Sequence, residues 1–240
     1  MNAILDEARR RGITRLCHLT PSANLAHILA AGELRPVADL RQGGDAYRPV
    51  DRERRDGAPG HLFLSVEYPN VWYHGRASAR DANFTGWVVL TFGAELLARP
   101  GTRFSPYNSA RDGSAGALEG PAGFGALFAP AVTGNATRVR RPGHPDWWPT
   151  DDQAEIQISG AIPLSAVREV LFPSEQQAAL DHFALARQFG MGHLLPPLSV
   201  APEVFDAPTL SGAVRAGSRV GEARFVPAAE GAAPAGGATP

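Results

Sequence analysis

Two short segments carry side chains whose types and order suit catalysis. One is RLCHLTPSANLAHILAAGEL, which starts at Arg15, and the other is DDQAEIQISGAIPLSAVREVLFPS, which starts at Asp151. The first places His18 on a strand-like run, and the second places Glu155 on an alternating one. A carboxylate such as that of Glu155 stabilises developing positive charge, and it takes up a proton if partial desolvation brings its pKa toward neutrality.

Both residues also have a purely structural interpretation. A lone glutamate on an amphipathic strand usually faces solvent, and an isolated histidine on a core strand is usually half-buried with its hydrogen bonds satisfied. The residues that flank Glu155 favour the catalytic interpretation, because they match a known pattern.

The two segments resemble the DarT family of ADP-ribosyltransferase toxins. The first resembles that family's strand-borne His-x-Thr, Asn-Leu helix and closing glycine, with matches at His18, Thr20, Asn24, Leu25 and Gly32. The second resembles its Gln-Ala-Glu strand and Val/Ile-Pro-Leu turn, with matches at Gln153, Ala154, Glu155, Ile162, Pro163 and Leu164. The resemblance spans roughly Ile13 to Phe189, and its two ends are the specific parts.

The resemblance implies an α+β ADP-ribosyltransferase fold, in which two packed sheets surround an NAD⁺-binding cleft and helices cover the outside. It implies that Glu155 is the catalytic residue in the transfer of ADP-ribose from NAD⁺ to a nucleobase, with release of nicotinamide. The expected acceptor is thymidine or guanosine in single-stranded DNA, because the attacking atom is hidden in a duplex. It further implies a toxin, in a toxin-antitoxin or phage-defence system, whose partner is an antitoxin that removes ADP-ribose or masks the site.

The same resemblance suggests which residues bind NAD⁺. The histidine of such enzymes contacts the adenosine-side ribose while main-chain groups hold the nicotinamide carboxamide, so His18, Leu19 and Thr20 are expected to form the cleft. Asn24 supports them from the start of the following helix. Tyr68 and Tyr73 are candidates for stacking on nicotinamide or a base, although core packing also explains an aromatic residue here.

One part of the sequence departs from the family. Alignment on Pro69 places Glu67 where the family has a catalytic arginine, so the role of that arginine does not carry over. Arg76 and Arg80, one turn apart on the following helix, are candidates to supply the charge, although exposed helical arginines are often only solvated. The departure indicates a divergent branch.

A basic and aromatic loop, RVRRPGHPDWW, precedes the Gln-Ala-Glu strand. Arginines contact phosphates, and bases stack on aromatic rings, so this loop is a candidate site for single-stranded nucleic acid. Packing of the two indoles on the core is an equally good interpretation. The candidate nucleic-acid contacts are Arg138, Arg140, Arg141, Trp147 and Trp148.

Composition narrows the remaining choices. The formal net charge is -1, so any nucleic-acid contact must be local, and all 23 Lys+Arg residues are arginine. No histidine, cysteine and carboxylate spacing suits a metal, and without lysine a GxxxxGK[ST] loop is excluded. With one cysteine and no long apolar run, we expect a cytoplasmic protein without a membrane segment.

The candidate residues must be positioned by a series of short elements. We expect helices over 2–11, from Thr20-Pro21 to Gly32, over 71–81 and over 175–189, and strands over 13–19, 61–66, 86–92, 152–159 and 167–172. Residues 35–60 are expected to be irregular, and 105–149 to form a long aromatic-bearing loop. Order is doubtful beyond Pro196. We expect one ADP-ribosyltransferase domain over 1–226 and a disordered Ala/Gly/Pro-rich tail over 227–240.

Two other functions remain open. An RNA-directed or protein-directed ADP-ribosyltransferase would carry the same Glu155 and His18 with a different acceptor loop. A non-catalytic nucleic-acid or ligand-binding module on the same fold is kept open by Glu67.

Overall fold

The computed structural model describes residues 2–43, 56–80 and 86–227 of the chain. Its helices are α1 (Ala3–Arg11), α2 (Leu25–Ala31), α3 (Val37–Gly43), α4 (Val71–Arg80), α5 (Gly120–Ala126), α6 (Glu175–Phe183) and α7 (Ala207–Arg215). Its strands are β1 (Arg15–Pro21), β2 (Glu33–Leu34), β3 (His61–Val66), β4 (Trp87–Gly93), β5 (Arg103–Ser105), β6 (Leu118–Glu119), β7 (Ala131–Thr133), β8 (Thr137–Val139), β9 (Glu155–Ser159), β10 (Ile162–Pro163), β11 (Val167–Phe172), β12 (Leu198–Val200) and β13 (Ala223–Arg224).

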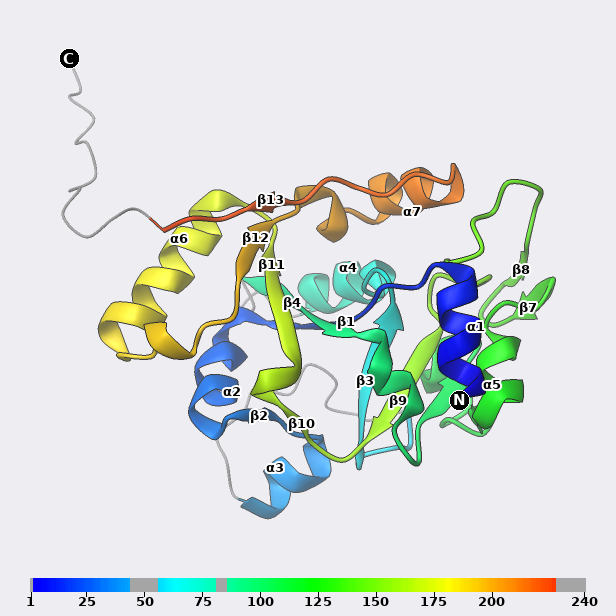
Figure 1. The fold of residues 1–240 in the computed structure, drawn as a ribbon, viewed down its shortest axis with the longest axis horizontal. Coiled ribbons are helices and arrows are strands. Elements are labelled where there is room, and N and C mark those ends of the chain that lie inside the picture. The colour runs from blue at the N-terminus through cyan, green and yellow to red at the C-terminus, as the bar shows by residue number, and fades with distance from the viewer. Residues whose placement is uncertain (1, 44–55, 81–85, 228–240) are drawn as a thin grey trace.

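Most strands belong to one mixed sheet. Within the described ranges it has nine strands in the order β13-β12-β11-β4-β1-β3-β9-β5-β6. β1 pairs with β4 along its whole length, but with β3 only at Leu16↔Val66 and Cys17↔Ser65. Figure 1 shows β1 crossing the view while β3 runs down it, so the strands diverge beyond this junction. The α+β class is confirmed, and the two sheets that we expected are two sections joined at β1 and β3.

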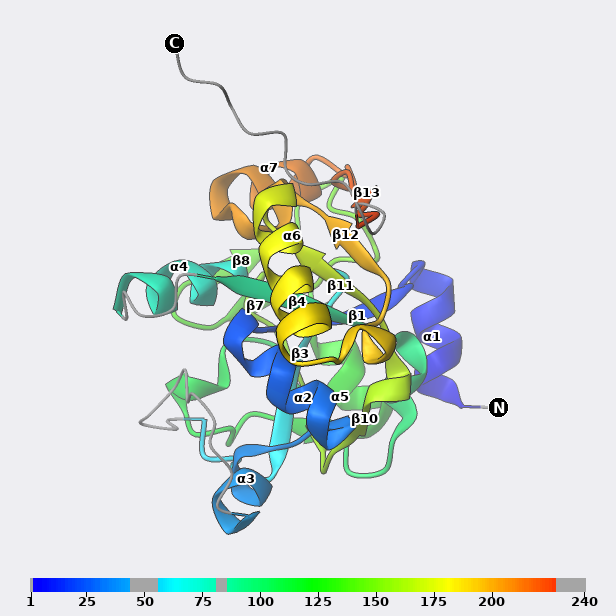
Figure 2. The ribbon, with the colours of Figure 1, turned by 90° about the vertical axis from the view of Figure 1, so that its left-hand side faces the viewer.

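Helices cover both faces of this sheet. One face packs against α1, α2, α5 and α6 in a large apolar cluster that includes Leu16, Leu90 and Ile156. The other face packs against α4 and α7 in a second cluster that includes Cys17 and Val89. Figure 2 shows α2 and α6 in front of the sheet, with α7 above them.

The start of the chain folds as its capping residues indicate. The Oδ1 atom of Asn2 accepts a hydrogen bond from Ile4 N at 3.0 Å, and Gly12 ends α1 with φ 76°, a left-handed conformation that favours glycine. The predicted helix start at Thr20-Pro21 is wrong, because these two residues still pair with β4 as part of β1. A 3-10 turn follows, and α2 begins only at Leu25. Proline suits the end of a strand, where its missing N–H breaks no ladder bond.

Several regions are more regular than the sequence indicated. α3 lies inside the segment expected to be irregular, of which 44–55 are outside the described residues. The segment 105–149 contains α5 and the β7–β8 hairpin, and its Phe124 and Phe128 are buried in the core. Glycines and short elements had hidden this periodicity.

The expectation that order is lost beyond Pro196 is wrong. β12 pairs in parallel with β11, β13 pairs with β12, and α7 packs Leu210 and Val214 into the second cluster. The predicted tail over 227–240 lies outside the described residues, except for its first residue.

Candidate active site

Glu155 is the first residue of β9, where the long preceding segment enters the sheet. Its carboxylate Oε2 accepts hydrogen bonds from Ser109 N at 3.1 Å and from Ser109 Oγ at 2.5 Å. Ser109 begins the 3-10 turn that follows β5, and Ser105 of β5 is the register partner of Glu155. The carboxylate is therefore held in place rather than free in solvent.

Burial raises the pKa of Glu155 to about 7. The two hydrogen bonds from Ser109 act in the opposite direction, and the negative charges of Asp56 and Asp112 add to the increase. A carboxylate with this pKa exchanges a proton near neutral pH, which is the property that a general base requires. Catalysis by Glu155 requires such desolvation, and the burial of its carboxylate provides it.

His18 lies in the middle of β1 and is half-buried. Its Nδ1 lies 2.9 Å from the carbonyl oxygen of Phe63, and because a carbonyl can only accept, Nδ1 carries the hydrogen. Burial lowers the pKa of His18, so the neutral ring is favoured and Nε2 is an acceptor. Within the described residues Nε2 has no hydrogen-bond partner, so it remains available to a hydroxyl group of a ligand.

Thr20 and Asn24 form a polar pair one turn further along. The Nδ2 atom of Asn24 donates to Thr20 Oγ1 at 3.1 Å. The Oδ1 atom of Asn24 is buried and accepts no hydrogen bond. A buried acceptor without a partner is costly in the free protein, so this atom fits a donor group supplied by a bound ligand such as NAD⁺.

The strand order brings the two motif-bearing segments close together. β3 separates β1, which carries His18, from β9, which carries Glu155. The Phe63 carbonyl that binds His18 belongs to the register partner of Gln157, two residues from Glu155. The histidine and the glutamate therefore flank the same short strand, at the place where the sheet divides into its two sections.

The aromatic candidates divide into different environments. Tyr68 is buried in the second cluster, in edge contact with Trp147 and near Trp148, and its hydroxyl accepts a hydrogen bond from Val220 N at 3.1 Å. Its ring is a core residue, so the stacking role suggested for Tyr68 conflicts with the structure. Tyr73 is half-buried on α4, and Leu19 is half-buried against the second cluster.

Glu67 is a structural anchor. It is fully buried, and its φ of 60° is in the left-handed region that side chains other than glycine rarely adopt. Its carboxylate accepts hydrogen bonds from the Thr14 hydroxyl at 3.1 Å and the Thr14 amide, and forms an ion pair with Arg219. Glu67 therefore ties the start of β1 to the C-terminal segment.

Of the two arginines suggested to replace that residue, Arg76 approaches the site. Its guanidinium NH2 donates to the Oε1 atom of Gln153 at 2.8 Å, two residues before Glu155. The side chain of Arg80 lies outside the described residues.

The basic and aromatic loop is partly committed to its own folding. The guanidinium of Arg140 donates to the Trp148 carbonyl at 2.7 Å and to the Pro145 carbonyl at 2.6 Å, and Trp148 is buried. The structure therefore contradicts a nucleic-acid role for Arg140 and Trp148. Arg141 is exposed and Arg138 half-buried. Trp147 is half-buried, with Arg219 over its ring at 4.4 Å.

Sequence reasoning missed two residues that hold this site. Ser109 lies 46 positions before Glu155 in a Gly/Ser-rich segment, and only the pairing of β5 with β9 brings them together. Asp152 is buried and accepts hydrogen bonds from Trp72 Nε1 and Trp148 Nε1, both at 3.2 Å, and from Ser211 Oγ at 2.7 Å. Arg215 of α7 forms an ion pair with it. The Asp-Asp pair before Gln-Ala-Glu was the available signal for Asp152.

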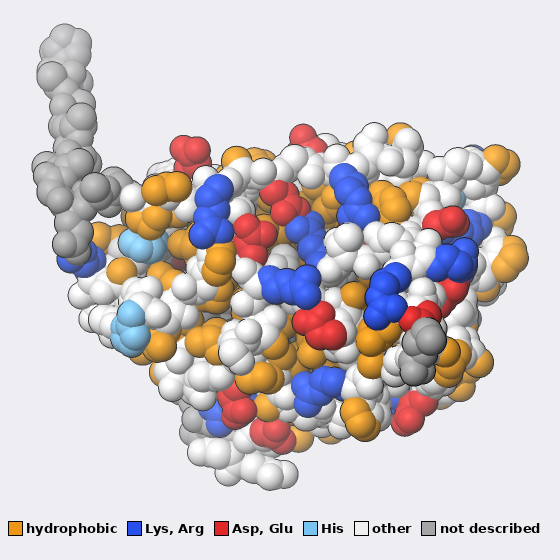
Figure 3. Space-filling model, viewed as in Figure 1, with side chains coloured by type: hydrophobic (Ala, Val, Ile, Leu, Met, Phe, Trp, Pro, Cys, Tyr) orange, Lys and Arg blue, Asp and Glu red, His pale blue; other side chains and the backbone are white. Residues whose placement is uncertain are grey.

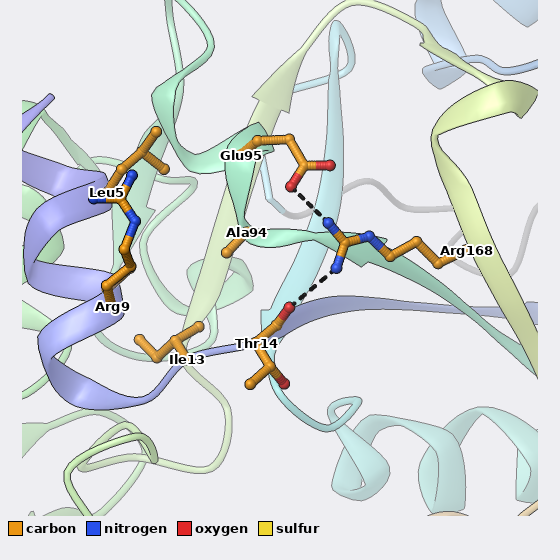
Figure 4. Close-up of a pocket in the computed structure, with 8 residues that line it drawn as sticks. Leu5, Arg9, Ile13, Thr14, Ala94, Glu95 and Arg168 are labelled. Carbon is orange, nitrogen blue, oxygen red and sulfur yellow. Dashed lines mark hydrogen bonds and ion pairs between the residues drawn. The ribbon is translucent and has the colours of Figure 1, made fainter. Parts of the chain in front are cut away.

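A cavity of about 190 Å³ lies away from these residues (Figure 4). It is lined by Leu5, Ala8, Arg9, Ile13, Thr14, Ala94, Glu95 and Arg168. Its two arginines are paired, Arg168 with Glu95 at 3.0 Å and Arg9 with Asp6 at 2.6 Å. No candidate site residue lines it, so it has no connection with the proposed chemistry.

The surface charges and the potential metal ligands of the described residues do not indicate a further site. Figure 3 shows arginine and acidic side chains interspersed over one face of the molecule, without a single large basic area. Among the residues described, no three His, Cys, Asp or Glu side chains lie close enough together to hold a metal ion. None of the helices in the described ranges combines the length and apolar character needed to cross a bilayer.

The mixed sheet has helices on both faces, and its histidine strand β1 and glutamate strand β9 lie on either side of β3. The family match over residues 17–206 identifies an ADP-ribosyltransferase that uses NAD⁺. The chain belongs to the DarT family, because residues 17–206 match the family model for "ssDNA thymidine ADP-ribosyltransferase, DarT". The expected family is thereby confirmed. No curated protein matches the chain.

Solved structures of the family share the fold. Thermus sp. 2.9 DarT in complex with NAD⁺ has a TM-score of 0.55 at 14% identity, over 80% of this chain and 97% of that chain. The same protein in complex with ADP-ribosylated ssDNA has a TM-score of 0.57 at 16% identity, over 81% and 97%. Thermosipho africanus DarTG in complex with ADP-ribose has a TM-score of 0.52 at 10% identity, over 80% of this chain and 50% of that one.

Proposed function

We propose that this chain transfers ADP-ribose from NAD⁺ to a thymidine base of single-stranded DNA, with Glu155 as the catalytic residue. The observation that carries the assignment of Glu155 is its carboxylate, partly buried at the start of β9, held by Ser109, and with a pKa raised to about 7. Membership of the DarT family supports the reaction and the acceptor.

The transfer of ADP-ribose from NAD⁺ to the base requires no further reactant. The bond between the ribose anomeric carbon and nicotinamide breaks, and the electron pair leaves with nicotinamide, which departs neutral. A ring nitrogen of the base forms the new bond to the same carbon. Glu155 stabilises the oxocarbenium-like sugar and takes the proton that the nitrogen loses, then releases it to water.

The residues around β1 suit NAD⁺ as substrate. We assign NAD⁺ binding to His18, Leu19, Thr20 and Asn24. The His18 Nε2 acceptor fits a ribose hydroxyl, and the buried Asn24 Oδ1 fits an N–H or O–H donor. Tyr73 remains a candidate for stacking from α4.

Contacts with DNA are assigned to residues of the loop before β9 that keep some exposed surface. Arg138, Arg141 and Trp147 are the candidates there, because Arg140 and Trp148 hold the loop together. Single-stranded DNA suits this arrangement, since arginines meet phosphates and bases stack on aromatic faces.

Arg76 is proposed to supply the positive charge that Glu67 cannot. Its hydrogen bond to Gln153 brings a guanidinium to the entry of the catalytic strand. A guanidinium there can hold an NAD⁺ phosphate or the acceptor base, because its planar fork donates several hydrogen bonds at once. Arg80, one turn further along α4, is kept as a second candidate from the sequence alone.

The proposed reaction also points to a biological setting. Modified bases block copying of DNA, so we propose that the protein is a toxin of the cytoplasm with an ADP-ribosyl hydrolase as antitoxin. The likeness of this chain to half of Thermosipho africanus DarTG favours such a pairing.

The test is incubation of the purified chain with NAD⁺ and each of four DNA homopolymers, followed by mass spectrometry. The expected result is a mass gain of one ADP-ribose on oligo-dT that Glu155→Ala abolishes. A gain on oligo-dG would move the acceptor to guanosine. Transfer only to RNA or protein would assign the reaction to the other acceptor class. If the unaltered protein and Glu155→Ala bind DNA equally and neither transfers ADP-ribose, the chain is a non-catalytic module.

A further inference from the structure

We propose that Ser109 is a positioning residue for Glu155, which fixes one carboxylate oxygen and leaves the other to receive the proton of the acceptor base. The inference rests on the proposed function, in which Glu155 is the catalytic base. Ser109 lies in the turn between β5 and β6, a part of the chain to which neither the motifs nor the family match assigns a role.

The backbone of Ser109 is held by hydrogen bonds of the residues before and after it. It is fully buried, and Asn108 precedes it as the cap of the 3-10 turn, where Asn108 Oδ1 accepts from Ala110 N at 3.0 Å. The carbonyl of Ser109 accepts from Ser114 N at 3.1 Å. With its backbone fixed in this way, Ser109 presents its N–H and its hydroxyl to the same atom, Glu155 Oε2.

Within the described residues the carboxylate accepts only these two hydrogen bonds, both at Oε2, and Oε1 accepts none. The charged groups that face Glu155 are Asp56 and Asp112, and both are acidic. Asp112 is itself held by the Tyr107 hydroxyl at 2.8 Å, and Asp56 by the Ala58 amide at 2.9 Å. Because no described cation pairs with Glu155, the two hydrogen bonds from Ser109 are what favours the ionised carboxylate against the effect of burial.

Holding Oε2 has a consequence for catalysis. A carboxylate with both oxygens free would rotate, and it would spend part of its time away from the productive orientation. Because two donors hold Oε2, the other oxygen, Oε1, points in one fixed direction. The same two hydrogen bonds lower the proton affinity of the carboxylate below that of a buried carboxylate without them. Ser109 therefore sets both the orientation and the pH range of the base.

The experiment compares Ser109→Ala with Ser105→Ala. Ser105 is a matched control, because it is also fully buried and lies in the same segment, and its Oγ donates to the Tyr107 carbonyl at 2.7 Å instead of to Glu155. The titration of Glu155 is followed by ¹³C NMR of the glutamate carboxyl carbons, with Glu155→Gln to assign the signal. Transfer to oligo-dT is measured as kcat and KM for NAD⁺ between pH 5.5 and 9.

Loss of a hydroxyl that binds a carboxylate is expected to raise the Glu155 titration midpoint by about one to two pH units in Ser109→Ala. The acidic limb of the pH–rate profile should move by the same amount, so that kcat at pH 7 falls about five-fold to fifty-fold while KM for NAD⁺ stays within about three-fold. Ser105→Ala should leave both midpoints in place. If Ser109→Ala does not fold, Ser109→Cys, with a weak S–H donor, should show a smaller shift in the same direction.

An unmoved titration midpoint in Ser109→Ala, or an equal shift in Ser105→Ala, would overturn the proposal. The NMR measurement needs no activity, so the two hypotheses fail separately. Activity that Glu155→Gln abolishes, together with an unmoved midpoint, would refute the role of Ser109 alone. A moved midpoint in a chain that transfers nothing would refute the proposed function and leave the contact intact.

Discussion

Replacement of Glu155 by glutamine is expected to stabilise the folded protein above pH 7 while having little effect near pH 4. The pKa of Glu155 in the folded chain is raised by burial from 4.5 to about 7. Between these values the unfolded chain has released its proton while the folded chain still holds it. The stability of the native protein therefore declines as the pH rises through this window and levels off above it. Glutamine does not titrate, so the variant escapes this decline.

The size of the effect follows from the shift. A difference of this size in pKa corresponds to at most about 3 kcal/mol of stability at pH 8. For a chain of this length that is a rise in Tm of roughly 6–12 °C over the unaltered protein. Glutamine keeps an acceptor oxygen for Ser109, so the comparison isolates the charge.

The assay is thermal and urea unfolding at pH 4 and pH 8 of three chains: the unaltered protein, Glu155→Gln and Glu119→Gln. Glu119 is exposed in β6, so its replacement should change stability equally little at both values. If Glu155→Gln alters Tm by the same amount at pH 4 and pH 8, the carboxylate is not desolvated as described. The same result would remove the physical basis for its role as a base.

Three other substitutions test the surroundings of the site. Asp152→Ala should cost about 3–5 kcal/mol in urea unfolding, because it leaves two indole N–H groups and Arg215 without their buried acceptor; a loss below about 1 kcal/mol would contradict this role. Arg76→Ala should reduce kcat/KM for transfer at least about ten-fold without changing Tm, and Arg76→Lys should restore only part of it, whereas full activity in the alanine variant would exclude catalytic support. Glu67→Arg, which restores the family residue, should destabilise the fold by about 3–5 kcal/mol through a buried cation beside Arg219, and recovery of a more active, stable enzyme would refute the structural role of Glu67.

Elements with strong periodicity or clear caps could be predicted from the sequence. β3 and β11 have the predicted bounds, and α1 ends at Gly12 as its left-handed cap requires. The start of α2 could not be predicted, since Thr20-Pro21 is as good a helix cap as a strand end, and only pairing with β4 decides between them. The C-terminal elements were missed because β12, α7 and β13 are short and become stable only through contacts with β11 and the second cluster.

The candidate site residues that belong to local motifs could be proposed from the sequence, and their positions in the fold are now known. His18 and Glu155 were chosen from local motifs, and the strand order places them on either side of β3. The residues that hold Glu155 and its strand come from far away in the chain. Ser109 reaches it across the β5–β9 pairing, and Arg215 reaches Asp152 from α7. No local pattern encodes a contact over such separations.

The loop before β9 also shows why local sequence was not sufficient, because its composition suggested contacts that the fold does not support. Arg140 and Trp148 have the composition of a nucleic-acid site, yet both are used within the protein. An arginine beside two indoles can donate hydrogen bonds to the phosphates and bases of single-stranded DNA. It can equally well donate them to the backbone carbonyls of its own loop. An arginine whose guanidinium already lies near several backbone carbonyls binds within the protein, and one without such carbonyls is free to bind DNA. The positions of those carbonyls depend on the tertiary fold, so the local sequence does not reveal them.

The C-terminal segment connects the divergence of this chain with its stability. The family match ends at residue 206, and the two residues that anchor acidic groups near the site, Arg215 and Arg219, lie beyond it. Arg219 pairs with the buried Glu67, and Arg215 pairs with Asp152 at the entry to β9. A buried glutamate at position 67 is tolerable only with a cation nearby. Removal of the residues after 206 should therefore release both carboxylates and unfold the region around Glu155.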